Sequence, residues 1–384
     1  MTIRNPACRT RVAPPALPTG SRQVRIAVHS AAAPARPALV RYLPRRLSCF
    51  HLSPQPDIVK EAFRRTLAGA MELQDRISLP DGIAVADVVY VADCLYHDVP
   101  EAVFVRDSSL VTSGQKREIR LNFDRGKAEA ERILSSMQAV SRAIVERART
   151  MPGSVARIKV MHDWLVERCR YANDGPQDLW RASGPLLQGK GSCVGLAKAF
   201  KYLADRTGVP GMVVTGFFEP KPGHVPISPF SGNHAWNLVF ADSAWYHLDV
   251  THDLGMTKEE SGTGFQREAP VRYDYFLLSD ADMRADRAFC SEGLPPCPRG
   301  YRYYERAGLF ASTERELERL LRRELRAGSA AVFQLPSQPG GNGLRERVSD
   351  LVSNALQSVR PGWKTFRLAS NDARGVYRVE ADAG

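Results

Sequence analysis

A cysteine at the start of an expected helix is the clearest chemical feature of the sequence. Gly191, Ser192 and Cys193 are followed at once by an Ala/Leu/Phe pattern typical of a helix, which places Cys193 at the helix N-terminus with Ser192 as its N-cap. The unpaired N–H groups and the positive end of the helix dipole favour a thiolate at that position. Cys193 is therefore a candidate nucleophile near neutral pH.

A histidine and an aspartate follow on a predicted β-hairpin. Two aromatic and β-branched runs flank a turn signal at residues 242–243. If Phe240 pairs with Trp245, His234 and Asp249 lie on one face of the sheet as diagonal neighbours. A carboxylate that orients an imidazole beside a thiol is the orienter, base and nucleophile set of covalent acyl transfer.

Asp253 is a rival for the role of the carboxylate. It lies only four residues beyond Asp249. Because Asp253 comes after the expected end of the strand, we favour Asp249.

The sequence around these residues resembles the transglutaminase-like superfamily, in particular bacterial proteins with a transglutaminase-like cysteine-protease core. The resemblance implies Cys193 as nucleophile, His234 as general base and acid, and Asp249 as the residue that orients it. His252 stands where the family usually has a tryptophan. The matching motifs are Gly-x-Cys-x-Gly-x-Ala-x-Ala-Phe at 191–200, Gly-Asn-His-Ala-Trp-Asn-Leu-Val at 232–239, Trp-Tyr-His-Leu-Asp-Val-Thr at 245–251 and Tyr-Asp-Tyr-Phe-Leu-Leu-Ser-Asp at 273–280.

Four further residues are candidates for the substrate site or the oxyanion site. Gln188, five residues before the nucleophile, either stabilises an oxyanion or is a plain loop residue, and the Cys193 N–H is the first donor expected there. Tyr171 either matches a tyrosine that relatives carry before the nucleophile loop or is an edge-strand aromatic. Trp236 and His247 share the expected face of the imidazole, and His247 either lines the pocket or is a half-buried histidine with satisfied hydrogen bonds.

Three classes of function are compatible with these features. The first is thiol-dependent acyl transfer on peptide or side-chain amides, as a cysteine peptidase, deamidase or transglutaminase. The second is a catalytically silent protein of the same fold that binds peptides or serves as a scaffold. The third, a nucleic-acid or membrane-surface binder, is disfavoured because no basic-aromatic interleaving and no basic amphipathic helix accompanies the charge. A peptide or protein amide is thus the expected partner, and the oligomeric state stays open.

The net charge of +11 is concentrated at the N-terminus. Residues 1–56 contain nine arginines, nine prolines and no Asp, Glu or Lys, which leaves about +2 for the rest of the chain. We interpret 1–56 as a basic Ala/Pro/Arg-rich disordered extension, with a targeting segment or a start codon placed too far upstream as alternatives. No apolar run is long enough for a signal-peptide core or a membrane span.

Seven cysteines are scattered without the spacing of a metal site, and an odd number argues against a complete disulfide framework. We therefore expect no metal and no cofactor. A reducing, cytoplasmic location is favoured, with export by a route that lacks a recognisable signal peptide as the alternative.

The predicted fold class is α+β, with a papain-like or transglutaminase-like core in which the nucleophile helix packs on an antiparallel sheet. Two small αβαββ modules flank this core, at 57–125 and 305–384, and the core itself spans 126–304. The first module is expected to contain helices at 58–73 and 83–96 and strands at 76–79, 102–105 and 116–123. The second is expected to contain helices at 314–327 and 344–359 and strands at 331–335, 365–368 and 376–380.

Overall fold

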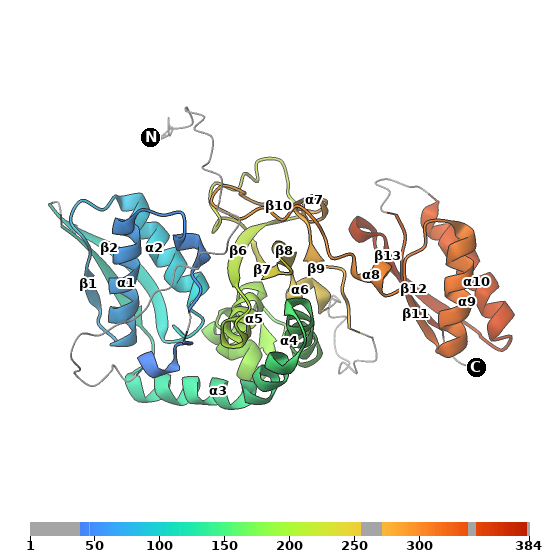
Figure 1. Cartoon of the computed structure of the whole chain (residues 1–384), viewed down its shortest axis with the longest axis horizontal. Helices are drawn as coiled ribbons and strands as arrows, with labels where there is room; N and C mark the ends of the chain where they lie inside the picture. The colour runs from blue at the N-terminus through green and yellow to red at the C-terminus, as the bar shows by residue number, and fades with distance from the viewer. Residues whose placement is uncertain (1–38, 46, 115, 255–270, 337–342, 382–384) are drawn as a thin grey trace.

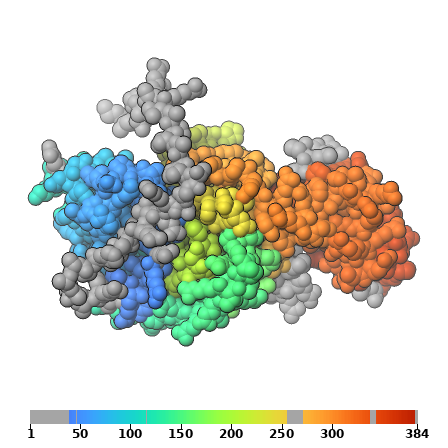
Figure 2. All heavy atoms as spheres, in the orientation of Figure 1, coloured from blue at the N-terminus to red at the C-terminus, as the bar shows by residue number. Residues whose placement is uncertain are grey.

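The computed structural model describes residues 39–45, 47–114, 116–254, 271–336 and 343–381. An N-terminal module, a central core and a C-terminal module follow one another along the long axis of the molecule (Figures 1 and 2). Within the described ranges, no helix is both long and apolar enough to cross a membrane.

The central core is built on a five-stranded antiparallel sheet with the strand order β10-β6-β7-β8-β9. Helix α5 (Cys193–Thr207) packs on β6 and β7, with Cys193 and Ala197 against Val213 and Ala235. The predicted core, a helix with the expected nucleophile on an antiparallel sheet, is confirmed. The strands are β6 (Gly211–Phe218), β7 (His234–Ala241), β8 (Ala244–Leu248), β9 (Phe276–Leu278) and β10 (Arg287–Ala288).

Helix α5 begins and ends at sequence signals. Ser192 Oγ accepts a hydrogen bond from the N–H of Gly195 at 3.4 Å, and Gly208 ends the helix in the left-handed conformation. Leu196, Phe200 and Leu203 are fully buried in the core. Each contributes about 1.5–3 kcal/mol through burial, which holds the helix in place.

Short elements and two long helices surround α5. The segment from β4 to β5 brings residues 170–191 to the N-terminal end of α5, where β4 and β5 pair in parallel. These elements are α3 (Lys127–Thr150), α4 (Ser154–Arg168), β4 (Arg170–Tyr171), the 3-10 turn η3 (Gln177–Trp180), the π-helical turn η4 (Gly184–Gln188), β5 (Lys190–Gly191) and α6 (Val250–Asp253). Two further short helices lie elsewhere, α7 (Asp280–Met283) against β8 and α8 (Tyr303–Arg306) against β11.

The hairpin of β7 and β8 has the predicted register, with Phe240 opposite Trp245. Asp242 and Ser243 form its two-residue turn and both have positive φ, at 44° and 65°, as the twist of a tight hairpin requires. The ladder ends at Leu248, because the chain then turns into α6. Asp249 thus lies just outside the sheet, where a paired strand residue was expected.

The flanking modules share one order of elements and one order of strands. The N-terminal sheet runs β1-β3-β2 and the C-terminal sheet β11-β13-β12, all antiparallel. The elements of the first are α1 (Asp57–Met71), β1 (Arg76–Ser78), α2 (Val85–Asp98), β2 (Val105–Ser113) and β3 (Lys116–Phe123). Those of the second are α9 (Glu314–Ala327), β11 (Ala330–Gln334), α10 (Leu344–Val359), β12 (Phe366–Asn371) and β13 (Val376–Ala381).

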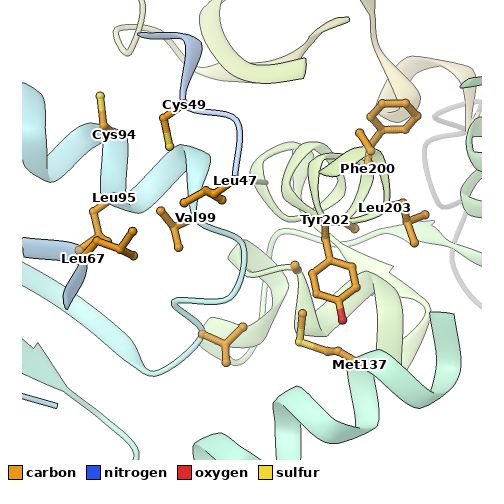
Figure 3. Packing of buried hydrophobic residues seen from close by; sticks show 14 of the residues in the cluster. Leu47, Cys49, Leu67, Cys94, Leu95, Val99, Met137, Phe200, Tyr202 and Leu203 are labelled. Atoms are coloured by element: carbon orange, nitrogen blue, oxygen red, sulfur yellow. The ribbon is translucent and has the colours of Figure 1, made fainter. Parts of the chain in front are cut away.

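The hydrophobic core of the N-terminal module continues into the central core. One cluster of buried side chains extends from Leu39 through both parts to Leu277. Figure 3 shows Leu95 of α2 beside Leu67 and Val99, the residue after α2, beside Leu47, with Phe200 and Tyr202 of α5 further along the same interior. The C-terminal module has a separate cluster and meets the central core through polar contacts, including the ion pair of Arg374 and Asp286 at 2.9 Å.

Residues 39–45 and 47–56 form an ordered segment, which we call the N-terminal strap. Leu39, Leu47 and Leu52 are buried in the shared core. Tyr42 is hydrogen-bonded to α3 at 2.7 Å, and His51 Nε2 donates to a carbonyl of β6 at 2.8 Å. The prediction that all of 1–56 is a disordered extension is therefore wrong for the strap, which includes the 3-10 turns η1 (Val40–Tyr42) and η2 (Phe50–Leu52). Residues 1–38 lie outside the described part of the chain.

Candidate active site

Cys193 is the first residue of α5 and is only 8% exposed. The glycines on either side of it permit close packing of the preceding segment. A Cβ atom at Gly195 would lie 2.1 Å from the carbonyl oxygen of Leu179, and one at Gly191 would lie 2.5 Å from Cγ of Pro185. The two glycines of the motif therefore let residues 179–191 cover the helix N-terminus.

His234 and Asp249 meet at the ends of neighbouring strands. His234 begins β7, and its Nε2 atom lies 2.7 Å from Oδ2 of Asp249. Asp249 follows β8 directly and is the N-cap of α6, since its Oδ1 atom accepts from the N–H of His252 at 3.3 Å. Both side chains are buried, and the Cys193 thiol interacts with His234. The three predicted residues thus form a continuous chain of contacts.

Two further basic side chains contact Asp249. Nδ1 of His252 lies 2.9 Å from Oδ2, and the guanidinium of Arg287 on β10 lies 3.2 Å from the same atom. Arg287 is fully buried and also pairs with Asp286 at 3.0 Å. In the sequence His252 is visible only as a departure from the family's usual tryptophan. Arg287 could not be predicted, because a two-residue strand 38 positions from Asp249 carries no periodic signal.

These contacts shift the pKa values of the three residues in a consistent direction. Burial alone would raise the pKa of Cys193, but the contact with His234 and its charge outweigh burial and lower it. Burial opposes the imidazolium, yet the charge and hydrogen bond of Asp249 raise the pKa of His234 to about 9. Burial likewise opposes the carboxylate, but His234 and His252 bring the pKa of Asp249 well below its usual range. The arrangement favours a thiolate and imidazolium pair at neutral pH.

Asp253, the rival carboxylate, has a different partner. Its Oδ2 atom lies 3.0 Å from Nε2 of His162 on α4, and its Oδ1 atom accepts from the N–H of Tyr275 at 3.0 Å. Asp253 is fully buried, and burial raises its pKa to about 6 although His162 opposes this. This carboxylate links α6 to α4 through His162. To orient the catalytic imidazole it would have to contact His234, which it does not.

The other predicted site residues differ in position. Tyr171 is 37% exposed on β4, where it pairs with Gly191. Burial raises the pKa of its phenol, and the charge of Cys193 raises it further, so the phenol lies near the thiol. Gln188 ends the turn η4 with an exposed side chain. Tyr96 of α2 carries no signal in the sequence, but burial and, to a smaller extent, the charge of Cys193 raise its pKa.

Trp236 and His247 form an internal pair, so His247 is a histidine with satisfied hydrogen bonds, the second of the two interpretations given for it. The indole N–H of Trp236 donates to Nδ1 of His247 at 2.9 Å. Nε2 of His247 lies 2.9 Å from Oδ1 of Asp280. Trp236 is 1% exposed and His247 is fully buried. With the indole donor engaged and both rings enclosed, neither side chain is available to a substrate.

Two clusters among the described residues bring possible metal ligands within 4.8 Å of one another. Neither could be predicted from spacing, because the members of each come from separate segments. In each cluster an imidazole nitrogen and a carboxylate oxygen already lie 2.7–2.9 Å apart. Two ligands of one tetrahedral zinc ion are separated by about 3.3 Å, so both clusters would have to open to admit one. The clusters are His234, Asp249 and His252, and His247, Asp280 and Cys297.

Comparison with known proteins gives low overall similarity. No curated protein matches the chain significantly. A proposed cysteine protease from Cytophaga hutchinsonii aligns with 12% identity and a TM-score of 0.24, over 38% of this chain and 65% of its own. A protein described as a TGase aligns with 16% identity and a TM-score of 0.26, over 52% of this chain and 55% of its own. A proposed protease from Parabacteroides distasonis aligns with 10% identity and a TM-score of 0.23, over 37% of this chain and 35% of its own. The chain therefore spans less than two thirds of each of these solved structures.

The family comparison covers the part of the chain that holds the site. The model of the transglutaminase-like superfamily matches residues 125–250, which include Cys193, His234 and Asp249. The strand end and the helix start that carry these residues both lie inside the match. Residues 125–250 are thus similar in sequence to the transglutaminase-like superfamily, and this match contains all three residues.

Proposed function

We propose that this protein catalyses thiol-dependent acyl transfer on peptide or side-chain amides, with Cys193, His234 and Asp249 as a triad. The observation that carries the proposal is the chain of contacts from thiol to imidazole to buried carboxylate. The lowered pKa of Cys193 and the raised pKa of His234 support it, because each favours the charged form that the chemistry needs.

The reaction proceeds in two steps. The Cys193 thiolate attacks the amide carbonyl, and the C–S bond forms. Backbone N–H groups in the first turn of α5, which lack acceptors within the helix, stabilise the oxyanion. The C–N bond then breaks as the His234 imidazolium gives its proton to the leaving amine, and a thioester remains.

The second step releases the acyl group and restores the site. His234 accepts a proton from water or from a second amine, whose oxygen or nitrogen attacks the thioester carbonyl as the C–S bond breaks. Water gives a carboxylic acid, as in a peptidase or deamidase, whereas an amine gives a new amide, as in a transglutaminase. Asp249 holds the ring orientation and stabilises the imidazolium throughout.

Trapping of the thioester tests this function. The protein is incubated with a library of acetylated peptide amides, quenched in acid and digested, and adducts on Cys193 are identified by mass spectrometry. We expect acyl adducts on Cys193, none in Cys193→Ala, and unchanged adducts in the control Cys290→Ala, whose cysteine is free and only partly buried. A peptide that binds tightly and gives neither adduct nor product would instead favour a catalytically silent binding protein.

A further inference from the structure

A line of alternating charges connects the C-terminal module to the proposed triad. Arg374 of the C-terminal module pairs with Asp286 at 2.9 Å, and Asp286 pairs with Arg287 at 3.0 Å. Arg287 in turn lies 3.2 Å from Asp249, the carboxylate that contacts His234. The side chains of Arg374, Asp286, Arg287 and Asp249 are at most 10% exposed, so solvent and salt screen their charges little. We call these four residues the charge chain.

Arg374 is presented to the core by the turn between β12 and β13. It ends the 3-10 turn η5 (Asp372–Arg374), and Gly375 follows it in the left-handed conformation, with φ at 62°. The carbonyl of Arg374 accepts from the side-chain amide of Gln334 on β11 at 2.9 Å, which ties the turn to its own sheet. Its guanidinium reaches the core, where Nη1 donates to the carbonyl of Asp282. The backbone of Arg374 is therefore fixed by the C-terminal module, and its partners belong to the core.

Each oxygen of the Asp286 carboxylate has its own partner. Arg374 binds Oδ1 at 2.9 Å, whereas Arg287 and the hydroxyl of Tyr275 bind Oδ2. No second partner of Oδ1 is found among the described residues, so without Arg374 the carboxylate is held at one oxygen only. Arg374 thus sets the orientation in which Asp286 meets Arg287.

Arg287 transmits this orientation to the triad. Its Nη1 atom pairs with Asp286, and its Nη2 atom donates to Oδ2 of Asp249, the oxygen that His234 also contacts. The guanidinium lies 4.4 Å from the ring centre of Phe218, which packs against it. Because a guanidinium is rigid and planar, a rotation imposed at Nη1 also moves Nη2. The contact between Asp249 and His234 thus depends on where Arg287 is held.

We propose that Arg374 is a positioning residue for the triad, which acts on Asp249 through Asp286 and Arg287. The C-terminal module has its own apolar core, and polar contacts join it to the central core. While the module is docked, Arg374 fixes Asp286 and Arg287, and the carboxylate of Asp249 stays against the imidazole. This gives the C-terminal module a role in the proposed reaction, and the inference rests on that proposed function.

The test compares kcat and KM of Arg374→Met with those of Arg378→Met. Arg378 is a matched control, because it lies in the same module and pairs with a core carboxylate, Asp274, outside the charge chain. We expect kcat to fall about fivefold or more in Arg374→Met alone, with KM unchanged because the change affects proton transfer and not substrate binding. Arg374→Lys, which keeps a charge to pair with Asp286, should restore part of the rate. Equal losses in the two Met variants would show that Arg374 only holds the module, and would overturn the proposal.

A double-mutant cycle shows whether Arg374 acts through Asp286. Asp286→Asn keeps the shape of the side chain, removes its charge and should itself lower kcat. In that background Arg374→Met should have little further effect, whereas Arg378→Met should have the same small effect in both backgrounds. Kinetics are measured well below the unfolding temperature of each variant. Independent losses that multiply for Arg374→Met and Asp286→Asn, or a wild-type kcat in Asp286→Asn, would contradict the charge chain.

A readout without substrate separates failure of this inference from failure of the proposed function. Alkylation of Cys193 by iodoacetamide at about pH 6 measures the thiolate, which His234 and Asp249 support, and needs no turnover. We expect slower alkylation in Arg374→Met than in the wild-type protein and in Arg378→Met. If no peptide is turned over and this difference is found, the proposed function fails and the positioning role stands. If neither kcat nor alkylation changes in Arg374→Met, the positioning role is wrong whatever the activity.

Discussion

Nδ1 of His252 lies 2.9 Å from Oδ2 of Asp249, the same oxygen that His234 contacts at 2.7 Å. Burial, opposed only in part by Asp249, lowers the pKa of His252, so its ring is neutral and donates from Nδ1. Its Nε2 atom is then an acceptor, buried and without a partner among the described residues. His252 therefore acts as a support for the carboxylate, in a position where the superfamily usually has tryptophan.

Replacement of His252 by Phe should weaken this support while keeping an aromatic ring in place. Asp249 retains His234 and Arg287, so we expect a fall in turnover of about 10-fold, the value of one hydrogen bond to a charged group. The measurement is kcat/KM together with its pH profile. His224→Phe, which changes an exposed-loop histidine that contacts Phe217, serves as the control. Turnover equal to wild type would show that His252 is not needed to hold Asp249.

The pKa values predict the pH dependence of turnover. His234 must be protonated to donate to the leaving amine, and its raised pKa of about 9 keeps it protonated through neutral pH. As pH rises through about 9 the imidazolium is lost, so kcat/KM should fall with an alkaline limb near that value. The acid limb should lie below the ordinary pKa of a thiol, because the pKa of Cys193 is lowered. An alkaline limb near the ordinary histidine value would contradict the strong coupling of His234 to Asp249.

Removal of the N-terminal strap should unfold the protein. Leu39, Leu47 and Leu52 are almost completely buried, and each contributes about 1.5–3 kcal/mol. Their loss together is comparable with the whole stability of a typical domain, about 5–15 kcal/mol. We expect a chain that begins at Asp57 to lose cooperative thermal unfolding, whereas one that begins at Leu39 keeps every described contact of the strap. Equal unfolding temperatures for these two chains would refute this role of the strap.

Local signals explain what could be predicted from the sequence. The start of α5 at Cys193 follows from the Ser192 cap and the apolar pattern, and α10 has the predicted bounds, Leu344–Val359. The hairpin register followed from a turn signal and two aromatic runs. Where the sequence pattern is local and regular, it predicts the type of element and which side chains share one of its faces.

Other features depend on contacts that the sequence does not display. The strap was hidden by its Arg and Pro content, because a few separated leucines give no periodicity. Strand β2 was expected at 102–105 but lies at Val105–Ser113. The prediction was wrong because most side chains of this strand are exposed and polar and give no apolar alternation. Arg287 and Asp249 come together only through the sheet, where β10 and β8 lie on opposite sides of β6 and β7.

The most direct test of the proposed triad is the pH–rate profile for alkylation of Cys193 by iodoacetamide, measured by mass spectrometry from about pH 5 to 10. Asp249→Asn removes the charge that raises the pKa of His234, and Asp253→Asn changes a buried carboxylate that contacts His162. We expect rapid alkylation at low pH in the wild-type protein and in Asp253→Asn, and a shift toward an ordinary thiol profile in Asp249→Asn alone. An ordinary thiol profile in the wild-type protein, or a shift only in Asp253→Asn, would contradict the triad of Cys193, His234 and Asp249.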